Sequence, residues 1–172
     1  EINSETDFVA RNEDFQNFCN LVSKTILSNK INNIDDLMNT NLESSKLSVS
    51  ESLTELLAKI GENILIKRLD FIQSDNNIHT QKYIHNCVNE NSGKIGVLLS
   101  IKYDNNTEKL DLFTKNLAMH IAAMSPKSID VDDLDKKLIE REKNIFQDQE
   151  KKSNKPDEIK EKIINGKLNK FY

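Results

Sequence analysis

The side chains best suited to bind a metal ion lie in one short segment. His79, His85 and Cys87 are spaced as metal ligands could be. No fourth ligand is apparent nearby, and strand twist could separate the two histidines or turn them to opposite sides. We therefore favour an interpretation in which all three are surface side chains at the rim of a β-hairpin. A metal-dependent enzyme is kept as a rival hypothesis that a metal assay would test.

The rest of the sequence gives no sign of a catalytic site. It contains no glycine-rich phosphate loop, no Gly-x-Ser-x-Gly motif and no His-Glu-x-x-His motif. His120 lies one position off the apolar stripe of a predicted helix, where histidine more often packs or donates a hydrogen bond than acts as a base. The acidic pairs at 35–36 and 132–133 are most simply helix-start residues. The residues therefore favour binding over bond making or breaking, with no catalytic residue, cofactor or metal.

Length and composition limit the kind of protein. The 172 residues are enough for one domain or two small ones; 30% are charged, 37% are hydrophobic, and the net charge is −4. This net acidity argues against direct nucleic-acid binding, which usually requires a basic face. No segment approaches the roughly 20 apolar residues that span a bilayer. The two cysteines, Cys19 and Cys87, stand far apart and are interpreted as free thiols.

A large aromatic side chain stands at a predicted turn near the start of the sequence. Ile2 lies in a short β-like run, and Thr6 or Asp7 can cap the helix that follows, because a short side-chain oxygen accepts from the free N–H groups of the first turn. Phe8 and Val9 come directly after this cap. The ring of Phe8 either folds back as a hydrophobic staple or points outward at a partner. The local pattern alone favours the staple.

The first half of the chain is predicted to be mainly helical. Steps of three and four between apolar residues predict a helix over 13–28, which Asn29-Lys30 ends because Asn tolerates left-handed geometry. A short helix is expected over 34–38.

The next helix is defined by both of its caps. Ser48 and Glu51 form a capping box, and Gly61 ends the helix because glycine adopts the left-handed conformation without a steric penalty. Alternating apolar residues then predict a strand over 62–73, which should pair with a strand over 1–4.

The second half combines a β-hairpin with helices. Alternating apolar residues predict strands over 78–88 and 95–101, joined by a polar turn that contains glycine. A helix is expected over 107–124, and Ser125-Pro126 ends it. Its predicted apolar face consists of Leu110, Phe113, Leu117, Ile121 and Met124.

Two more helices are expected to form an antiparallel hairpin. The first starts at Asp130 or Asp132 and runs to about residue 152. A three-residue turn follows, and Pro156 takes the favoured first position of the second helix. Both apolar stripes are thin and the other faces are charged, so the hairpin should stand out from the body. The stripe of the first helix contains Val131, Leu134, Leu138 and Ile145.

These elements predict an α+β fold. Two small antiparallel sheet-and-helix subdomains, residues 1–76 and 77–129, would be joined to a projecting, coiled-coil-like helical hairpin at residues 130–172.

Three separated motifs resemble one protein family. The segment 3–12, Asn-Ser-Glu-Thr-Asp-Phe-Val-Ala-Arg-Asn, closely resembles the signature of elongation factor Ts, the nucleotide exchange factor of elongation factor Tu. Similar matches follow at 59–64 and 118–123, in the order and spacing of that family. The resemblance implies a guanine nucleotide exchange factor that binds elongation factor Tu and promotes GDP release during translation elongation. It also implies a fragment, with a small helical module missing upstream and the last strands of the second subdomain missing downstream.

The resemblance also implies which residues contact the partner. These are Thr6, Asp7, Phe8, Val9, Ile60, Gly61, Tyr83 and His85. Asp7 and Phe8 match the pair that enters the partner's nucleotide-binding domain near its magnesium site. Ile60 and Gly61 match a helix end that faces the same region.

Tyr83 and His85 match a Tyr-x-His motif of the second subdomain that lies toward the partner. Ile84 and Asn86 replace the residues expected around this histidine, so this third contact departs from the family's pattern.

A second hypothesis gives the chain an interaction role without exchange. In it, the hairpin over 130–172 contacts a second copy of the chain or another protein, because a hairpin in this place can do so in the family. Size-exclusion chromatography with and without the hairpin would separate the two hypotheses. The expected location is the bacterial cytoplasm, with an organelle as the alternative.

Overall fold

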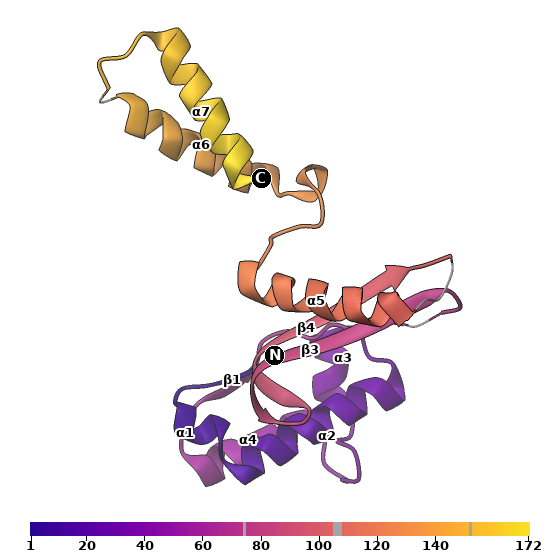
Figure 1. Cartoon of the computed structure of the whole chain (residues 1–172). Coiled ribbons are helices and arrows are strands. Elements are labelled where there is room, and N and C mark those ends of the chain that lie inside the picture. Colours follow the sequence, from indigo (N-terminus) through magenta and orange to yellow (C-terminus); the bar gives the residue numbers. More distant parts are fainter. Residues whose placement is uncertain (74, 105–107, 152) are drawn as a thin grey trace. The chain divides into compact units, whose positions relative to one another are not determined.

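The computed structural model describes residues 1–73, 75–104, 108–151 and 153–172 (Figure 1). Within these ranges it contains seven α-helices and two antiparallel sheets of two strands each, which confirms the predicted α+β class. Its contacts divide the chain into two compact units, Glu1–Ala123 and Met124–Tyr172. The further division of the first unit at residue 76 stays a prediction. No helix in the described ranges has the length and apolar character needed to cross a bilayer.

A short sheet pairs the start of the chain with the segment that follows residue 61. β1 (Ile2–Ser4) pairs antiparallel with β2 (Ile64–Ile66), as the sequence predicted. β2 is much shorter than the strand expected over 62–73, because the apolar alternation slips after Ile66. Beyond it, the amino terminus of Glu1 still donates a hydrogen bond to the Arg68 carbonyl at 2.8 Å.

Three helices surround one apolar core with this sheet. They are α2 (Glu13–Asn29), α3 (Ile34–Asn39) and α4 (Val49–Ile60), and α4 contacts both of the others. Side chains spaced three and four residues apart face inward, as expected for amphipathic helices. The buried core residues on these elements and the sheet include Phe15, Phe18, Val22, Leu37, Val49, Leu53, Leu56, Ile64 and Ile66.

The predicted caps of α4 are both present. The Ser48 hydroxyl accepts from the Glu51 N–H at 3.2 Å, and the Glu51 carboxylate accepts from the Ser48 N–H at 2.8 Å. Gly61 ends the helix in the left-handed conformation, with φ 77°. At the end of α2, Lys30 rather than Asn29 adopts this conformation, with φ 52°. Asn29 is the last helical residue, and its side chain donates to the Thr25 carbonyl at 2.9 Å.

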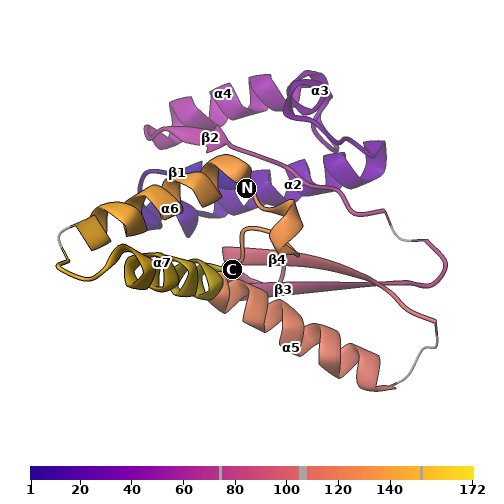
Figure 2. The same ribbon diagram turned by 90° about the horizontal axis from the view of Figure 1, so that it is seen from above.

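The remainder of the first unit is a long β-ribbon with one helix beside it. β3 (Ile78–Asn89) pairs antiparallel with β4 (Ser92–Lys102), and α5 (Glu108–Met124) runs along this ribbon in Figures 1 and 2. The predicted inner face of α5 is partly wrong, since Phe113 and Met124 are 57% and 66% exposed. Thr114, Ala118 and Ala122 are buried instead, because small side chains let the helix approach closely.

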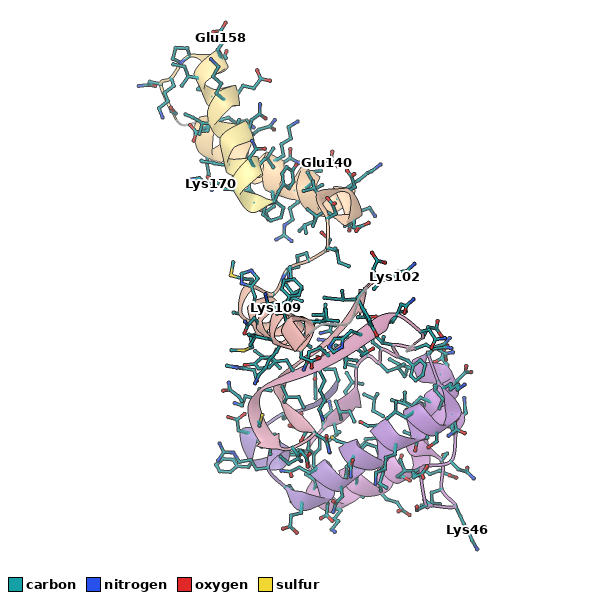
Figure 3. All side chains as sticks on the ribbon, turned by 45° about the vertical axis from the view of Figure 1, so that its right-hand side comes forward. Lys46, Lys102, Lys109, Glu140, Glu158 and Lys170 are labelled. Carbon is teal, nitrogen blue, oxygen red and sulfur yellow. The ribbon has the colours of Figure 1, made fainter. Side chains whose placement is uncertain are left out.

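The second unit contains two packed helices that run in roughly opposite directions. α6 (Lys136–Lys151) follows a 3-10 turn, η1 (Val131–Asp133), and α7 (Asp157–Phe171) returns along it. Glu140, Glu158 and Lys170 project away from the hairpin in Figure 3. These charged outer faces agree with the predicted pattern.

The sequence placed both helix starts of the hairpin too early. Asp130 caps η1 and not the long helix, while the Asp135 carboxylate accepts from the Lys137 N–H at 2.9 Å near the start of α6. Pro156 is the N-cap of α7 and not its first helical residue. The predicted stripe of the first helix also differs, since Val131 and Ile145 are exposed. On α7 the buried residue is Leu168. The later start of α6 follows from Asp135, because its carboxylate caps the helix in place of Asp130 or Asp132.

One lysine links the two helices of the hairpin. Lys167 lies 2.9 Å from a Glu150 carboxylate oxygen and 3.0 Å from the Gln149 side-chain oxygen, and its ammonium lies over the Phe146 ring. The hydrogen bond from Lys167 holds the pKa of the Glu150 carboxyl below its usual value. The inner face of the hairpin is therefore partly polar.

Candidate functional site

Phe8 is exposed at the start of a one-turn helix. α1 (Asp7–Ala10) is capped by Thr6, whose hydroxyl oxygen accepts from the Val9 N–H at 3.4 Å. The Phe8 side chain is 87% exposed, whereas Val9 is 6% exposed and belongs to the core. The hydrophobic staple that the local pattern favoured is therefore not formed, because Val9 occupies the inward position.

The end of α4 lies beside this exposed ring. A shallow hollow is lined by Phe8, Val9, Asn12, Asp14, Lys59 and Ile60. Gly61, also exposed, turns the chain from Ile60 into β2. The structure thus brings together two segments far apart in the sequence, and both were predicted to contact a partner. We call the residues Thr6–Val9, Ile60 and Gly61 the Phe8 corner.

Polar contacts hold the Phe8 corner together. The Thr6 hydroxyl donates to the Glu62 carboxylate, with oxygens at 2.9 and 3.0 Å. Lys59 Nζ lies 2.7 Å from an Asp14 carboxylate oxygen and joins the end of α4 to the start of α2. Neither Glu62 nor Asp14 was among the contact residues predicted from the sequence. Glu62 directly follows Gly61 in one of the family motifs, but no local pattern indicates that its partner is Thr6.

The β3–β4 ribbon reaches the Phe8 corner through an ion pair. Lys94 Nζ on β4 lies 3.1 Å from both carboxylate oxygens of Asp7, and both side chains are more than half exposed. Such an exposed pair contributes about 1 kcal/mol or less. A partner that offered Asp7 a better contact could therefore displace Lys94. No local pattern in the sequence indicates a role for this lysine either.

Tyr83 and His85 lie on the ribbon and not in the Phe8 corner. They occupy the same face of β3, and the Tyr83 hydroxyl is 2.9 Å from His85 Nδ1. His85 stands opposite Ile95, the residue after Lys94. Six of the eight predicted contact residues therefore share one corner, and the other two form a separate pair on the strand beside Lys94.

The metal-binding cluster considered for the segment 79–87 is not formed. His79 Nε2 lies 3.1 Å from the Thr114 hydroxyl, and His85 forms a hydrogen bond with Tyr83. The Cys87 thiol donates to the Ile84 carbonyl at 3.3 Å. Across the described ranges, no three His, Cys, Asp or Glu side chains are placed to hold a metal ion together. Each of the candidate ligands is used in a local contact instead.

An exposed aromatic ring held on a capped turn, beside a second helix end, is typical of a protein-binding surface. The chain belongs to the elongation factor Ts family, because the family model described as Elongation factor TS matches residues 5–172. This confirms the resemblance seen in the three motifs, and the family is one of translation elongation factors.

Several bacterial relatives match the whole chain. It is 41% identical over 174 residues to elongation factor Ts of Rickettsia typhi, and 38% identical over 172 residues to that of Rhodospirillum centenum. It is 36% identical over 172 residues to elongation factor Ts of Allorhizobium ampelinum. Each alignment covers 100% of this chain and 55% of the relative. The chain therefore spans about half the length of these relatives.

Proposed function

We propose that this chain binds elongation factor Tu, in a bacterial cytoplasm, and promotes the release of GDP from it without chemical catalysis of its own. Membership of the elongation factor Ts family supports this proposal. The observation that carries it is the Phe8 ring, 87% exposed beside Ile60 at the joined Phe8 corner. Covering an exposed apolar ring with a partner's surface is favourable, because it removes the ring from water.

The physical basis of exchange is linkage between two ligands of one protein. If the factor and GDP each weaken the binding of the other, the free energy of coupling is the same in both directions. Typical couplings of about 1–3 kcal/mol change an affinity by roughly 5–150-fold. Full burial of one Phe side chain is worth about 1.5–3 kcal/mol. If the ring is buried only in the GDP-free partner, this single contact is large enough to supply a coupling of this size.

Phe8 and Asp7 have complementary roles in this proposal. The Phe8 ring inserts between side chains of the partner and moves a helix or loop by steric force. The Asp7 carboxylate leaves Lys94 and disfavours, by repulsion, the anionic ligands that hold magnesium. Since the magnesium ion is the largest positive charge on the diphosphate, its loss weakens the binding of GDP.

The other predicted contacts extend this surface. Ile60 and Gly61 face the same region of the partner as Phe8, while Thr6 and Val9 support the ring through the cap and the core. Tyr83 and His85 form a second contact from β3, for which their mutual hydrogen bond supplies a fixed geometry.

The release of labelled GDP from elongation factor Tu tests this function. We expect the unsubstituted chain to accelerate release in a saturable manner. Phe8→Ala should lower the maximal release rate by at least about fivefold, the low end of the typical coupling range. Its unfolding transition should be unchanged, because the removed ring is exposed.

Leu27→Ala is the matched control, since it removes another large apolar side chain, 65% exposed, from α2. We expect this variant to exchange GDP as the unsubstituted chain does. Equal release rates for Phe8→Ala and the unsubstituted chain would refute the role of the ring. Unfolding of the Phe8→Ala variant would assign the ring to stability instead.

A further inference from the structure

Glu62 connects the two segments that make up the Phe8 corner. Its carboxylate accepts from the Thr6 hydroxyl, with both oxygens within 3.0 Å. The same hydroxyl oxygen accepts from the Val9 N–H at 3.4 Å as the cap of α1. Thr6 therefore uses its donor on Glu62 and its acceptor on the helix that carries Phe8.

The helix that presents Phe8 needs support from the rest of the fold. α1 has four residues, whereas isolated helices shorter than about 12–15 residues are marginal in water. Val9 anchors α1 in the core, and its neighbours Thr6 and Asp7 are held by Glu62 and Lys94. The exposed pair with Lys94 would be lost when Asp7 turns to a partner. The hydrogen bond from Thr6 to Glu62 would remain, because it does not involve Asp7.

The backbone of Glu62 lies between two structured segments. It is half-buried, it follows the left-handed Gly61 and it precedes Ile64, which is 2% exposed in β2. The Glu62 carboxylate therefore offers Thr6 an acceptor at a fixed place beside α1.

We propose that Glu62 is a positioning residue for nucleotide exchange, which holds Thr6 and thereby orients Asp7 and Phe8 against Ile60 before the partner arrives. This inference rests on the proposed function. Without the bond, α1 samples other orientations, and the apparent affinity falls by the fraction of chains that keep the competent one. Once bound, Phe8 makes the same contacts. Loss of Glu62 therefore raises the half-saturating concentration and leaves the maximal release rate unchanged, the opposite of the result expected for Phe8→Ala.

The test measures GDP release from elongation factor Tu over a range of chain concentrations. Glu62→Ala should raise the half-saturating concentration roughly fivefold, the change that loss of one ordinary hydrogen bond produces. Glu62→Gln keeps a side-chain carbonyl oxygen that can accept from Thr6, so it should stay within about twofold of the unsubstituted chain. The maximal rate should be the same for all three chains.

Ser48→Ala is the control for a purely structural effect. It removes the cap at the other end of α4, which costs about 1 kcal/mol of stability, and it lies outside the Phe8 corner. Release is measured at a temperature at which circular dichroism shows every variant to be folded. Ser48→Ala should then have an unchanged half-saturating concentration.

The outcomes separate the two proposals. If the unsubstituted chain does not accelerate GDP release, the proposed function is wrong, and the role of Glu62 falls with it. If the unsubstituted chain is active and Glu62→Ala matches it, only the role of Glu62 is wrong. A Glu62→Gln chain as weak as Glu62→Ala would also overturn the role, because the effect would then belong to the charge. An equal rise for Ser48→Ala would assign the effect to general stability.

Discussion

Phe8 and Val9 are adjacent apolar residues with opposite environments. Consecutive side chains on a helix diverge by about 100°, since each turn has about 3.6 residues, so one of the two faces the core and the other faces water. Local sequence could not decide between them, because either one satisfies a hydrophobic contact with α2. The core has room for Val9, which is 6% exposed, and the larger ring is left outside.

The polar contacts of the Phe8 corner join residues that are far apart in the sequence. Asp7 pairs with Lys94 and Thr6 with Glu62, in each case across a large part of the chain. Helix-cap rules predicted Thr6 or Asp7 as the cap, and the structure has Thr6, whose bonded N–H lies three residues away. No comparable local rule identifies Lys94 or Glu62.

The two cysteines should differ strongly in reactivity. Cys19 packs against the core, and burial raises the pKa of its thiol to about 11, while Cys87 is exposed on β3. At pH 8, only about one Cys19 thiol in a thousand would be ionised, and the thiolate is the reactive form. We expect a thiol reagent at pH 8 to label Cys87 at least about tenfold faster than Cys19, measured by mass spectrometry.

Cys87→Ser supplies the control for this measurement. The folded variant should take up label slowly, and unfolding in urea should expose its one remaining thiol to rapid labelling. Rapid labelling of folded Cys87→Ser would show that the position of Cys19 opens readily and would contradict its burial.

Among the helices, the predictions were accurate where the deciding interactions lie between near neighbours in the sequence. α4 was predicted correctly from Ser48 to Gly61 because both caps bond within four residues along the chain. The predicted inner face of α5 was partly wrong, because close packing buries the small side chains of Ala118 and Ala122. The start of α6 was wrong because several acidic residues could cap it, and Asp135 is the one that does.

The left-handed end of α4 provides a test at this scale. Gly61 has φ 77°, and a Cβ placed there would meet no atom within 4 Å, so the cost of a side chain is conformational and not steric. Gly61→Ala should lower the free energy of unfolding by about 1 kcal/mol, measured by urea denaturation.

Gly166→Ala is a matched substitution with the opposite expected sign. Gly166 lies inside α7, is exposed, and also has open space around it. Alanine should stabilise this helix by about 0.8–1 kcal/mol, because it restricts the unfolded chain and favours the helix. A stabilising effect of Gly61→Ala would contradict the conformational account of the cap.

At the scale of the whole molecule, the Phe8 corner lies entirely within the unit Glu1–Ala123, which has its own core. A chain that ends at residue 129 should therefore keep GDP release within about twofold of the full chain, a margin smaller than the typical couplings of about fivefold or more. The circular dichroism of the shortened chain serves as the check that it is folded.

The same truncation tests the alternative role of the hairpin. A full chain that elutes as a dimer, with a shortened chain that elutes as a monomer, would support self-association through residues 130–172. A large loss of exchange in the folded, shortened chain would place a partner contact on the hairpin and contradict the expectation above. Self-association and the domain boundary at residue 76 stay predictions.

The amino-acid sequence alone was enough to predict the α+β class, most helices and strands, the caps of α4 and the family. These depend on apolar periodicity, on bonds between near neighbours and on motifs that are continuous in the chain. The three-dimensional structure was needed to show that Phe8 is exposed and that Glu62 and Lys94 hold Thr6 and Asp7. Those features result from packing between distant segments, and competition for one core decides which side chain is buried.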